Sequence, residues 1–386
     1  MGIKFAKETL FAVLKMAAAF AGKFVVMKDD KPTETALMRL EFNGWNLIIE
    51  ATDGLMSGIH TEMPAPGSDV KTYELPAKLL LDAVSAAVGD EVELVCEKTG
   101  LTVKGRVGKA TINAVAGNII PPLDQPGESV TTDFTCDEMK RAIDLVSPSA
   151  DRNGNRPGLA GVRIAPDRAK NTVTFAATDG VRLAVYTTPT VRDVGAFKEA
   201  FTLPIETVGP LTDCLSKQAG NVGLTVTGSR ATFHWHWQDA DGNTWQGYAF
   251  AQRQSDNFPE WQALIPRTCK TRVSFDEKLA AALRTARVIA REVGGGMQPA
   301  TMTISDKTCV VASEVAEVGS TSTEVTPIQV EGEQSGVSVS FNISLIPTQI
   351  GSGVVIGLNP GRLSPIVMRC PAVEGWTYVL MPLQAA

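Results

Sequence analysis

A phrase of four residues that occurs twice constrains the fold of this chain more than any other feature. Ala-Thr-Asp-Gly stands at 51–54 and at 177–180, each time after an apolar run and before a strand-like alternation that ends at a proline. The offset of 177 − 51 = 126 residues is the size of a domain. Because Asp and Gly supply turn geometry between strands, we expect Asp53 and Asp179 to lie in equivalent turns of two related domains.

Other features recur at nearly the same spacing along the sequence and extend the repeat to the whole chain. Helices are expected directly after Pro76 and after Pro204, since proline is well tolerated at a helix start. Two further helices begin with the Ser/Thr-x-x-Glu spacing of a capping box. These boxes are Thr135 with Glu138 and Ser274 with Glu277. In a third, fainter copy, "VSVSFNISLIPTQIG" leads into a second helix.

The repeat predicts an α+β fold of three modules, each with the element order helix, strands, helix, strands. A chain of 386 residues is also too long for one ordinary core. Prolines and polar residues gather at 121–127 and at 266–271, where linkers are expected. We therefore expect modules at 1–125, 126–266 and 267–386.

Composition bounds the class of protein. A hydrophobic content of 44% with 20% charged residues is typical of a globular chain, and no apolar window is long enough to span a membrane. Lys7, Glu8 and Lys15 interrupt the N-terminal apolar run, which favours an amphipathic helix over a signal peptide. The six cysteines are scattered singly, which fits a reducing cytoplasm.

The net charge of −6 means that any contact with nucleic acid needs positive charge gathered on one surface. Arg284, Arg287 and Arg291 share one helix face, different from the face of apolar residues such as Leu279 and Leu283 that would face a sheet. Such a stripe suits a phosphate-facing surface, although it also suits an ordinary solvated helix face. Further basic residues on or beside predicted helices are Lys7, Lys15, Lys78, Lys140, Arg141, Arg152 and Lys217.

Signatures of catalysis and of metal binding do not occur in the sequence. There is no Walker-type Gly-x-x-x-x-Gly-Lys-Ser/Thr and no Gly-x-Ser-x-Gly. His234 and His236 would share one face of a strand, but no paired cysteines accompany them. We therefore expect no enzyme, no metal and no cofactor. A hydrolase using Asp53 or Asp179 stays open as an alternative that lacks a visible base.

With these patterns in hand, the chain resembles the bacterial DNA polymerase III beta subunit, the sliding clamp, as a divergent member. The resemblance runs along nearly the whole length and is strongest in the second and third modules. The stretches that carry it, in the order of the family, are "RPGLAGVRI" at 156–164, "ATDGVRLAV" at 177–185, "NFPEWQALIP" at 257–266, "FNISLIPTQI" at 341–350 and "YVLMPL" at 378–383.

The resemblance implies a head-to-tail homodimer, in which helices line a central hole and sheets form the outer wall and the subunit contacts. Duplex DNA would pass through this ring without sequence readout, and a clamp loader would place the ring on DNA. The family also tethers the replicative polymerase and other partners in the cytoplasm, through a pocket between the second and third domains. A monomeric clamp-like adaptor that binds partner peptides without encircling DNA is the alternative.

Carried over position by position, the resemblance assigns a largely apolar pocket for partner peptides. Arg182 could instead pair with Asp179 and brace the turn. The rim departs from the family, with Val181 in place of a frequent histidine, Ala263 in place of a frequent arginine, and Leu345 in place of a frequent tyrosine. We therefore expect a divergent clamp, viral or accessory, with altered partner preference. The implied pocket residues are Leu159, Thr178, Gly180, Arg182, Leu183, Pro259, Leu264, Asn342, Val379, Met381, Pro382 and Leu383.

Overall fold

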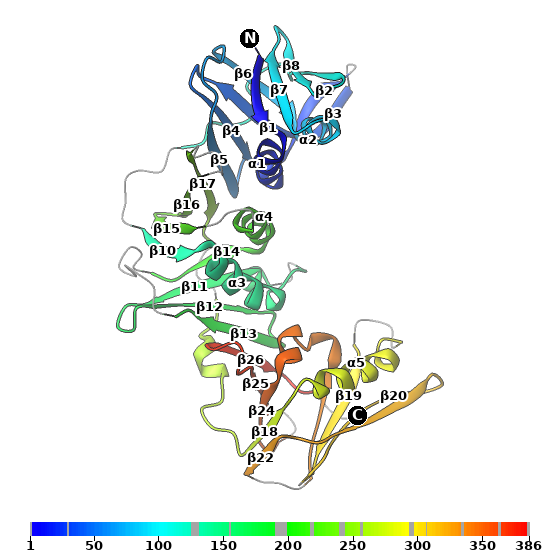
Figure 1. Cartoon of the computed structure of the whole chain (residues 1–386). Coiled ribbons are helices and arrows are strands. Elements are labelled where there is room, and N and C mark those ends of the chain that lie inside the picture. The colour runs from blue at the N-terminus through cyan, green and yellow to red at the C-terminus, as the bar shows by residue number, and fades with distance from the viewer. Residues whose placement is uncertain are drawn as a thin grey trace. The chain divides into compact units, whose positions relative to one another are not determined.

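The computed structural model divides the chain into two compact units (Figure 1). Unit 1 comprises Met1–Asp144, Gly161–Val173 and Thr190–Asp256, and unit 2 comprises Leu145–Ala160, Thr174–Pro189 and Asn257–Ala386. The residues that the structure describes are 2–28, 31–124, 131–153, 156–189, 199–216, 220–238, 244–254, 258–292, 297–305, 307–332, 336–361 and 364–383.

The first part of unit 1 follows the predicted order of helix, strands, helix, strands. Its elements are β1 (Gly2–Ala6), α1 (Lys7–Phe20), β2 (Lys23–Lys28), β3 (Lys31–Phe42), β4 (Asn46–Thr52), β5 (Ser57–Pro64), β6 (Lys71–Pro76), α2 (Ala77–Ala86), β7 (Glu91–Cys96), β8 (Gly100–Lys104) and β9 (Lys109–Asn113).

The rest of unit 1 repeats parts of this order. Its elements are β10 (Thr132–Thr135), most of α3 (Cys136–Val146), β11 (Gly161–Asp167), β14 (Phe201–Pro204), α4 (Ile205–Leu215), β15 (Asn221–Thr227), β16 (Arg230–Gln238) and β17 (Thr244–Gln252).

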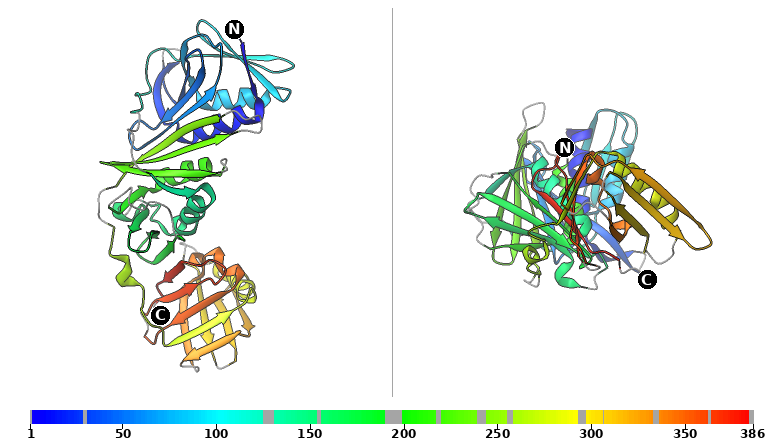
Figure 2. Two further views of the ribbon diagram at one scale, coloured as in Figure 1. Left: turned by 60° about the vertical axis from the view of Figure 1, so that its left-hand side comes forward. Right: turned by 90° about the horizontal axis from the view of Figure 1, so that it is seen from below.

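Two sheets organise unit 1. A four-stranded sheet has the order β1-β7-β8-β9, and a larger one has the order β10-β15-β16-β17-β5-β4-β3-β2, with β6 paired to β3. In the larger sheet, β17 from the second predicted module pairs antiparallel with β5 from the first (Figures 1 and 2). A row of backbone hydrogen bonds therefore crosses between the two predicted modules.

The helices of unit 1 begin where the sequence predicts them. α1 is amphipathic and buries residues such as Leu10, Leu14 and Phe20, while Lys15 is exposed. It packs against α2, α4 and the strands β4 and β5. Pro76 and Pro204 are the N-cap residues of α2 and α4, where the missing N–H of proline breaks no helical hydrogen bond.

Unit 2 has many strands and few helices. Its elements are η1 (Ser147–Ser149), η2 (Pro157–Leu159), most of β12 (Thr172–Thr178), β13 (Arg182–Thr187), η4 (Trp261–Leu264), β18 (Thr271–Phe275), α5 (Lys278–Ala290), β19 (Pro299–Ile304), β20 (Cys309–Val315), β21 (Gly319–Val325), β22 (Gln329–Gly332), β23 (Val337–Asn342), η5 (Ile343–Leu345), η6 (Thr348–Ser352), β24 (Val354–Leu358), β25 (Ile366–Arg369) and β26 (Trp376–Leu380).

The strands of unit 2 also lie in two sheets. One runs in the order β12-β13-β26-β25-β24-β18-β22, and the other is the four-stranded β21-β20-β19-β23. α5 packs against β20 and β21 through buried residues that include Leu279, Leu283, Ala286 and Ala290, so the predicted sheet-facing side of this helix is confirmed. The predicted α+β class is confirmed as well.

The predicted module boundaries stay a prediction. Each compact unit combines strands from two predicted modules, because β5 shares a sheet with β17 and β13 shares one with β26. Part of the expected linker at 121–127 lies outside the described residues.

Two local expectations are wrong. The second helix expected in the third module is a pair of short 3₁₀ turns, η5 and η6. Pro347 and the glycines at 351 and 353 interrupt this stretch and disfavour an α-helix. Ser274 does not cap α5, because it lies inside β18 and the side chain of Asp276 accepts the N–H of Lys278 at 3.0 Å instead. The Thr135 cap is confirmed by its hydrogen bond from the Glu138 N–H, at 3.1 Å.

Among the helices in the part of the chain that the structure describes, none combines the length and the apolar character needed to cross a membrane.

We expect Asp276→Ala to lower the free energy of unfolding by about 1 kcal/mol, since it removes a side-chain acceptor at the start of α5. Ser274→Ala is the matched control and should cost clearly less. Urea unfolding followed by circular dichroism measures both. A larger loss for Ser274→Ala than for Asp276→Ala would contradict this assignment of the cap.

Candidate functional site

The second Ala-Thr-Asp-Gly turn joins β12 to β13 in unit 2. Oδ1 of Asp179 accepts the backbone N–H groups of Val181 and Arg182, both at 3.0 Å. The Thr178 hydroxyl donates to the Arg182 carbonyl at 2.6 Å and accepts the N–H of Gly180 at 3.1 Å. Gly180 has a φ of +85°, in the region that favours glycine. Each residue of the phrase from Thr178 onward therefore has a role in forming the turn.

The first copy, between β4 and β5 in unit 1, repeats these contacts. Thr52 donates to the Ser57 carbonyl at 2.6 Å and accepts the N–H of Gly54 at 3.0 Å. Oδ1 of Asp53 accepts three backbone N–H groups, including that of Ser57 at 2.9 Å. Asp53 and Asp179 thus occupy equivalent turns, as the sequence predicts. Their hydrogen bonds explain both aspartates without a hydrolytic role.

Arg182 braces the second turn. Its Nε donates to Oδ2 of Asp179 at 2.8 Å, and the two side chains are only 20% and 21% exposed. In the first copy the Ser57 hydroxyl takes this place and bonds Oδ2 of Asp53 at 3.0 Å. Of the two roles expected for Arg182, the structure contains the brace, and the charge of its guanidinium is already paired.

An apolar floor lies beside this turn. β13 and β26 pair antiparallel and set Leu183 opposite Val379. Both side chains are buried, at 2% and 4% exposure, in a cluster with Ala176 and Val185. Phe258, Trp261 and Ile265 pack against the same cluster. The segment 258–265, which contains Pro259 and Leu264, is therefore held against the floor.

The rim of the site is apolar and exposed. Val181, Leu264 and Met381 are 45%, 50% and 39% exposed. The N–H of Met381 donates to the Val181 carbonyl at 2.9 Å, which fixes the end of β26 against the turn. Leu159 is half-buried in η2, and η1 of the same segment contacts β13. The structure thus gathers most of the predicted pocket residues around one apolar floor.

Asn342 has a structural role at the edge of this region. Its Oδ1 accepts the N–H of Ser344 at 3.1 Å, the Ser344 hydroxyl at 2.8 Å and the N–H of Gln298 at 3.2 Å. It therefore caps η5. The N–H of Leu383 donates to the Ser340 carbonyl at 2.7 Å, which ties the C-terminal segment to β23. Pro382 and Leu383 are half-buried.

Sequence reasoning missed two residues of this region. Arg156 is exposed and its guanidinium donates to the Asp179 carbonyl at 3.4 Å, beside Gly180. Trp261 packs on the apolar floor. Both stand inside stretches that carry the family resemblance, so proximity to those motifs was the available signal.

Some of the candidate DNA-facing residues already bind other groups of the protein. The ammonium of Lys7 donates to the carbonyls of Ser85 and Ala87, at 2.8 and 2.6 Å, and thus caps the end of α2. Lys140 pairs with Asp144. Lys217 lies outside the described residues.

All three arginines of the stripe are exposed, two of them on α5 and Arg291 at its C-cap. Arg287 donates to the Ile343 carbonyl at 2.6 Å, and Arg291 lies 3.4 Å from the carboxylate of Glu292. The other candidates that are exposed are Lys15, Lys78, Arg141 and Arg152.

The histidine pair on β16 is not part of a metal cluster. No group of three or more His, Cys, Asp or Glu residues able to hold a metal occurs among the described residues. His234 is half-buried and burial lowers its pKa, while His236 is exposed.

Known proteins of the sliding-clamp type are similar to this chain in sequence. Residues 133–241 match the family described as the DNA polymerase III beta subunit, central domain. The beta sliding clamp of Synechococcus elongatus is 25% identical over 340 residues, which cover 86% of each chain.

Solved structures match over the whole chain. The DNA polymerase III beta subunit from Thermotoga maritima aligns over 100% of both chains, with a TM-score of 0.81 and 20% identity. A C. crescentus beta sliding clamp, with PEG bound to a region proposed to tether beta motifs, aligns over 100% of this chain and 99% of its own, with a TM-score of 0.81 and 18% identity. The resemblance predicted from the sequence is therefore confirmed: the chain has the fold of the bacterial sliding clamps, and its central stretch matches that of the DNA polymerase III beta subunit.

Proposed function

We propose that this protein is a DNA sliding clamp that encircles duplex DNA without reading its sequence, and that it tethers a polymerase and other partners by their peptide motifs. The protein holds its partners on DNA and catalyses no reaction of its own. The observation that carries the proposal is a strand-to-strand junction that occurs twice within the chain, together with two matching strand edges that have no partner strand among the described residues.

The two internal junctions have the same form. In unit 1, the hairpin β4–β5 meets the hairpin β16–β17 through β5 and β17. In unit 2, the hairpin β12–β13 meets the hairpin β25–β26 through β13 and β26. Even the flanking bond repeats, because Gln252 donates to the Met56 carbonyl as Met381 does to that of Val181.

Two further hairpins do not meet another hairpin within the described part of the chain. β9 closes the hairpin β8–β9 and β21 closes the hairpin β20–β21, and each lies at the edge of a four-stranded sheet. Edge strands present unpaired N–H and C=O groups that a second chain can bond. A head-to-tail dimer in which β21 of one copy pairs with β9 of the other would make the third junction by the same geometry.

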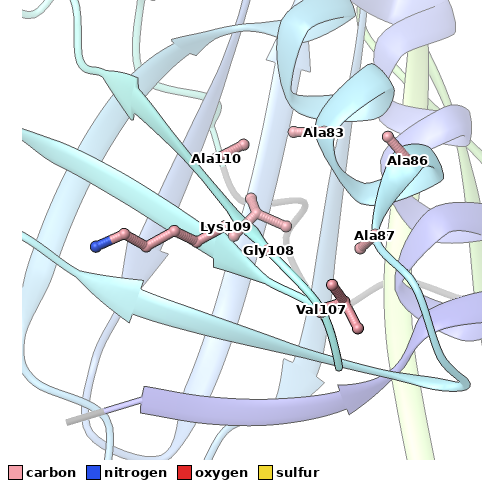
Figure 3. Close-up of a pocket in the computed structure, with 9 residues that line it drawn as sticks. Ala83, Ala86, Ala87, Val107, Gly108, Lys109 and Ala110 are labelled. Atoms are coloured by element: carbon pink, nitrogen blue, oxygen red, sulfur yellow. The ribbon is translucent and has the colours of Figure 1, made fainter.

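The surroundings of these edges suit each other. Beside β9, a cavity of about 190 Å³ opens between α2 and the hairpin, lined by small apolar residues such as Ala83 and Ala86 (Figure 3). Beside β21, the turn residue Val318 and the helix residue Val288 are 51% and 52% exposed. Apolar side chains of that size fit an alanine-lined cavity and gain by leaving water.

Charge favours the same pairing. Arg106 and Lys109 are exposed on the hairpin that ends in β9, and Figure 3 shows Lys109 extending away from α2. Glu314, Glu317 and Glu324 are exposed on the hairpin β20–β21. Opposite charges on two edges steer their encounter and set their orientation.

Sparse basic residues on the helices support the DNA-facing role. Arg284, Lys15, Lys78 and Arg141 are exposed helix residues in a chain of net charge −6. A few phosphate contacts give weak, salt-dependent and sequence-independent binding, which allows sliding. A clamp loader would open the ring onto DNA.

The apolar site next to the second Ala-Thr-Asp-Gly turn supports the tethering role. A buried floor surrounded by the exposed side chains of Val181, Leu264 and Met381 offers pockets for leucine and aromatic anchors. A beta-motif tethering region is proposed for the C. crescentus clamp, and we assign the corresponding role to this site.

For the ring, we expect a solution mass near twice 41.1 kDa by light scattering. Val107→Asp and Val318→Asp each place a carboxylate in the proposed contact and should shift the mass toward the monomer. Val70→Asp, at a residue 78% exposed and outside the contact, is the control and should leave the dimer intact. A monomer in the unmodified chain at micromolar concentration would leave a peptide-binding adaptor as the better description.

For DNA, we expect Arg284→Ala to weaken binding to duplexes of unrelated sequence equally and to reduce the salt slope of the affinity by about one. Arg272→Ala is the control, because Arg272 is an exposed arginine on a strand. Fluorescence anisotropy at several salt concentrations gives both slopes. Equal losses for the two variants would argue against a specific DNA-facing role of α5.

For the partner site, we expect Met381→Asp to weaken binding of a glutamine-led, Leu-Phe-ended clamp-binding peptide by about tenfold or more, because a charge enters an apolar contact. Met297→Asp, at another exposed methionine of unit 2, should bind the peptide as the unmodified chain does. Calorimetry measures both affinities. The order of affinities within a panel of such peptides should differ from the order on a typical bacterial clamp. An identical order would argue against an altered partner preference.

A further inference from the structure

A buried histidine in unit 1 is held between two carboxylates. His60 lies on β5 with a side chain only 5% exposed. Its Nδ1 is 2.8 Å from Oε1 of Glu50 on β4, and its Nε2 is 3.1 Å from Oε1 of Glu62. The other oxygen of Glu62 accepts the side-chain amide of Gln246, on β17, at 2.8 Å. Both ring nitrogens of His60 therefore face acceptors.

The same network continues to a backbone segment that leads toward the second module. Glu50 bonds Arg39 at 3.2 Å, and Arg39 bonds Glu74 at 3.0 Å. Arg39 also donates to the Ile120 carbonyl. The carboxylate of Glu74, 2% exposed, accepts the N–H groups of Ile119 at 2.7 Å and Ile120 at 3.1 Å. Three backbone groups at 119–120 are thus held by buried charges.

A second route links His60 to the end of this segment. The ring of Tyr248 stacks on the imidazole with centroids 5.0 Å apart and planes at 10°. The Tyr248 hydroxyl donates to the Asp124 carbonyl at 3.4 Å. Arg230 lies 3.5 Å from the Asp124 carboxylate and over the ring of Phe250. Both ends of 119–124 are therefore tied to the sheet that carries His60.

The groups that face His60 set its charge. Burial favours the neutral ring, but the hydrogen bonds that the ring donates to the carboxylates of Glu50 and Glu62 outweigh burial and raise the pKa of His60 above its usual 6.5. Tyr248 covers the ring from β17, and burial raises its own pKa so far that it stays neutral. His234 on β16 lies on the other side of Tyr248, at 6.3 Å between ring centroids, and burial lowers its pKa.

We propose that His60 is the pH-responsive centre of a latch that holds the segment 119–124 against the sheet of unit 1. The protonated ring donates to both carboxylates at once. The neutral ring has one N–H, so one of the two carboxylates must then face a lone pair. This inference goes beyond clamp function and holds whether or not a ring forms.

The link from ring to segment runs through Glu50. When the imidazolium charge is lost, Glu50 keeps Arg39 as its cationic partner and draws that guanidinium away from Glu74 and Ile120. Because the pKa of His60 is higher in the folded chain, this stabilisation is present below about 6.5 and is lost as pH rises through the raised value. The latch is therefore closed at pH values below the raised pKa of His60 and loosened above it.

Hydrogen exchange read by mass spectrometry on the full chain tests the latch. Protection factors of a peptide covering 115–124, each normalised to its intrinsic rate, should fall by about tenfold between about pH 6 and about pH 9. A peptide covering β8 serves as the reference and should not change. Equal protection of 115–124 at both pH values would overturn the proposal.

Two variants separate the latch from general stability. His60→Gln carries no charge at any pH, so its 115–124 peptide should be weakly protected and independent of pH, whereas the control His234→Gln should keep the normal dependence. If His60→Gln does not fold, Glu62→Gln takes its place. It removes one of the two negative charges beside the imidazolium and should move the midpoint of the protection change to lower pH. An unchanged midpoint would refute the role of His60.

Discussion

Backbone hydrogen bonding between strand edges is the interaction on which the rest of this structure depends. β5 pairs with β17 and β13 pairs with β26, so at each of these two junctions the strand edges cover each other. Because these bonds use groups that every residue carries, the junctions survive extensive change in sequence. This explains how solved clamps only 18% to 20% identical align over nearly their whole length.

The repeated Ala-Thr-Asp-Gly motif helps to form these strand junctions. Each Ala-Thr-Asp-Gly turn brings one strand back so that the next can reach the neighbouring repeat. Thr52 and Thr178 make the same two bonds, and glycine supplies the same positive φ. The copies differ at the residue that satisfies the outer aspartate oxygen, a serine in one and an arginine in the other. The two turns therefore share their backbone geometry and differ in the side chain that braces the aspartate.

Patterns with a local physical cause were predictable from the sequence. The apolar face of α5, the Thr135 cap and the helix starts after Pro76 and Pro204 follow from spacing alone. Features decided by distant partners were not predictable. Nothing in the sequence near Lys7 shows that its ammonium ends α2.

In the candidate site, too, features with a local cause were predictable, and features decided by distant partners were not. The family motifs pointed to the apolar floor, since all of its residues except Ala176 lie within them. The cap that Asn342 forms on η5 is local, but its further bond from the Gln298 N–H joins residues that are far apart in sequence. The His60 network depends on side chains from β3, β4, β5 and β6, and only the fold brings them together. Burial and pairing of charges are tertiary properties, and pattern reasoning has no access to them.

A junction that joins two different edges carries a geometric demand. Such heterologous contacts produce a closed ring only if the rotation at every joint adds up to a full turn, and otherwise they produce an open helical filament. With three repeats per chain, a small angular error at one joint is multiplied around the circle. If the chain forms the proposed ring, the angle of each strand-edge joint matters as much as its strength, because a substitution that tilts β5 against β17 would favour open fibres over closed rings without weakening a single contact.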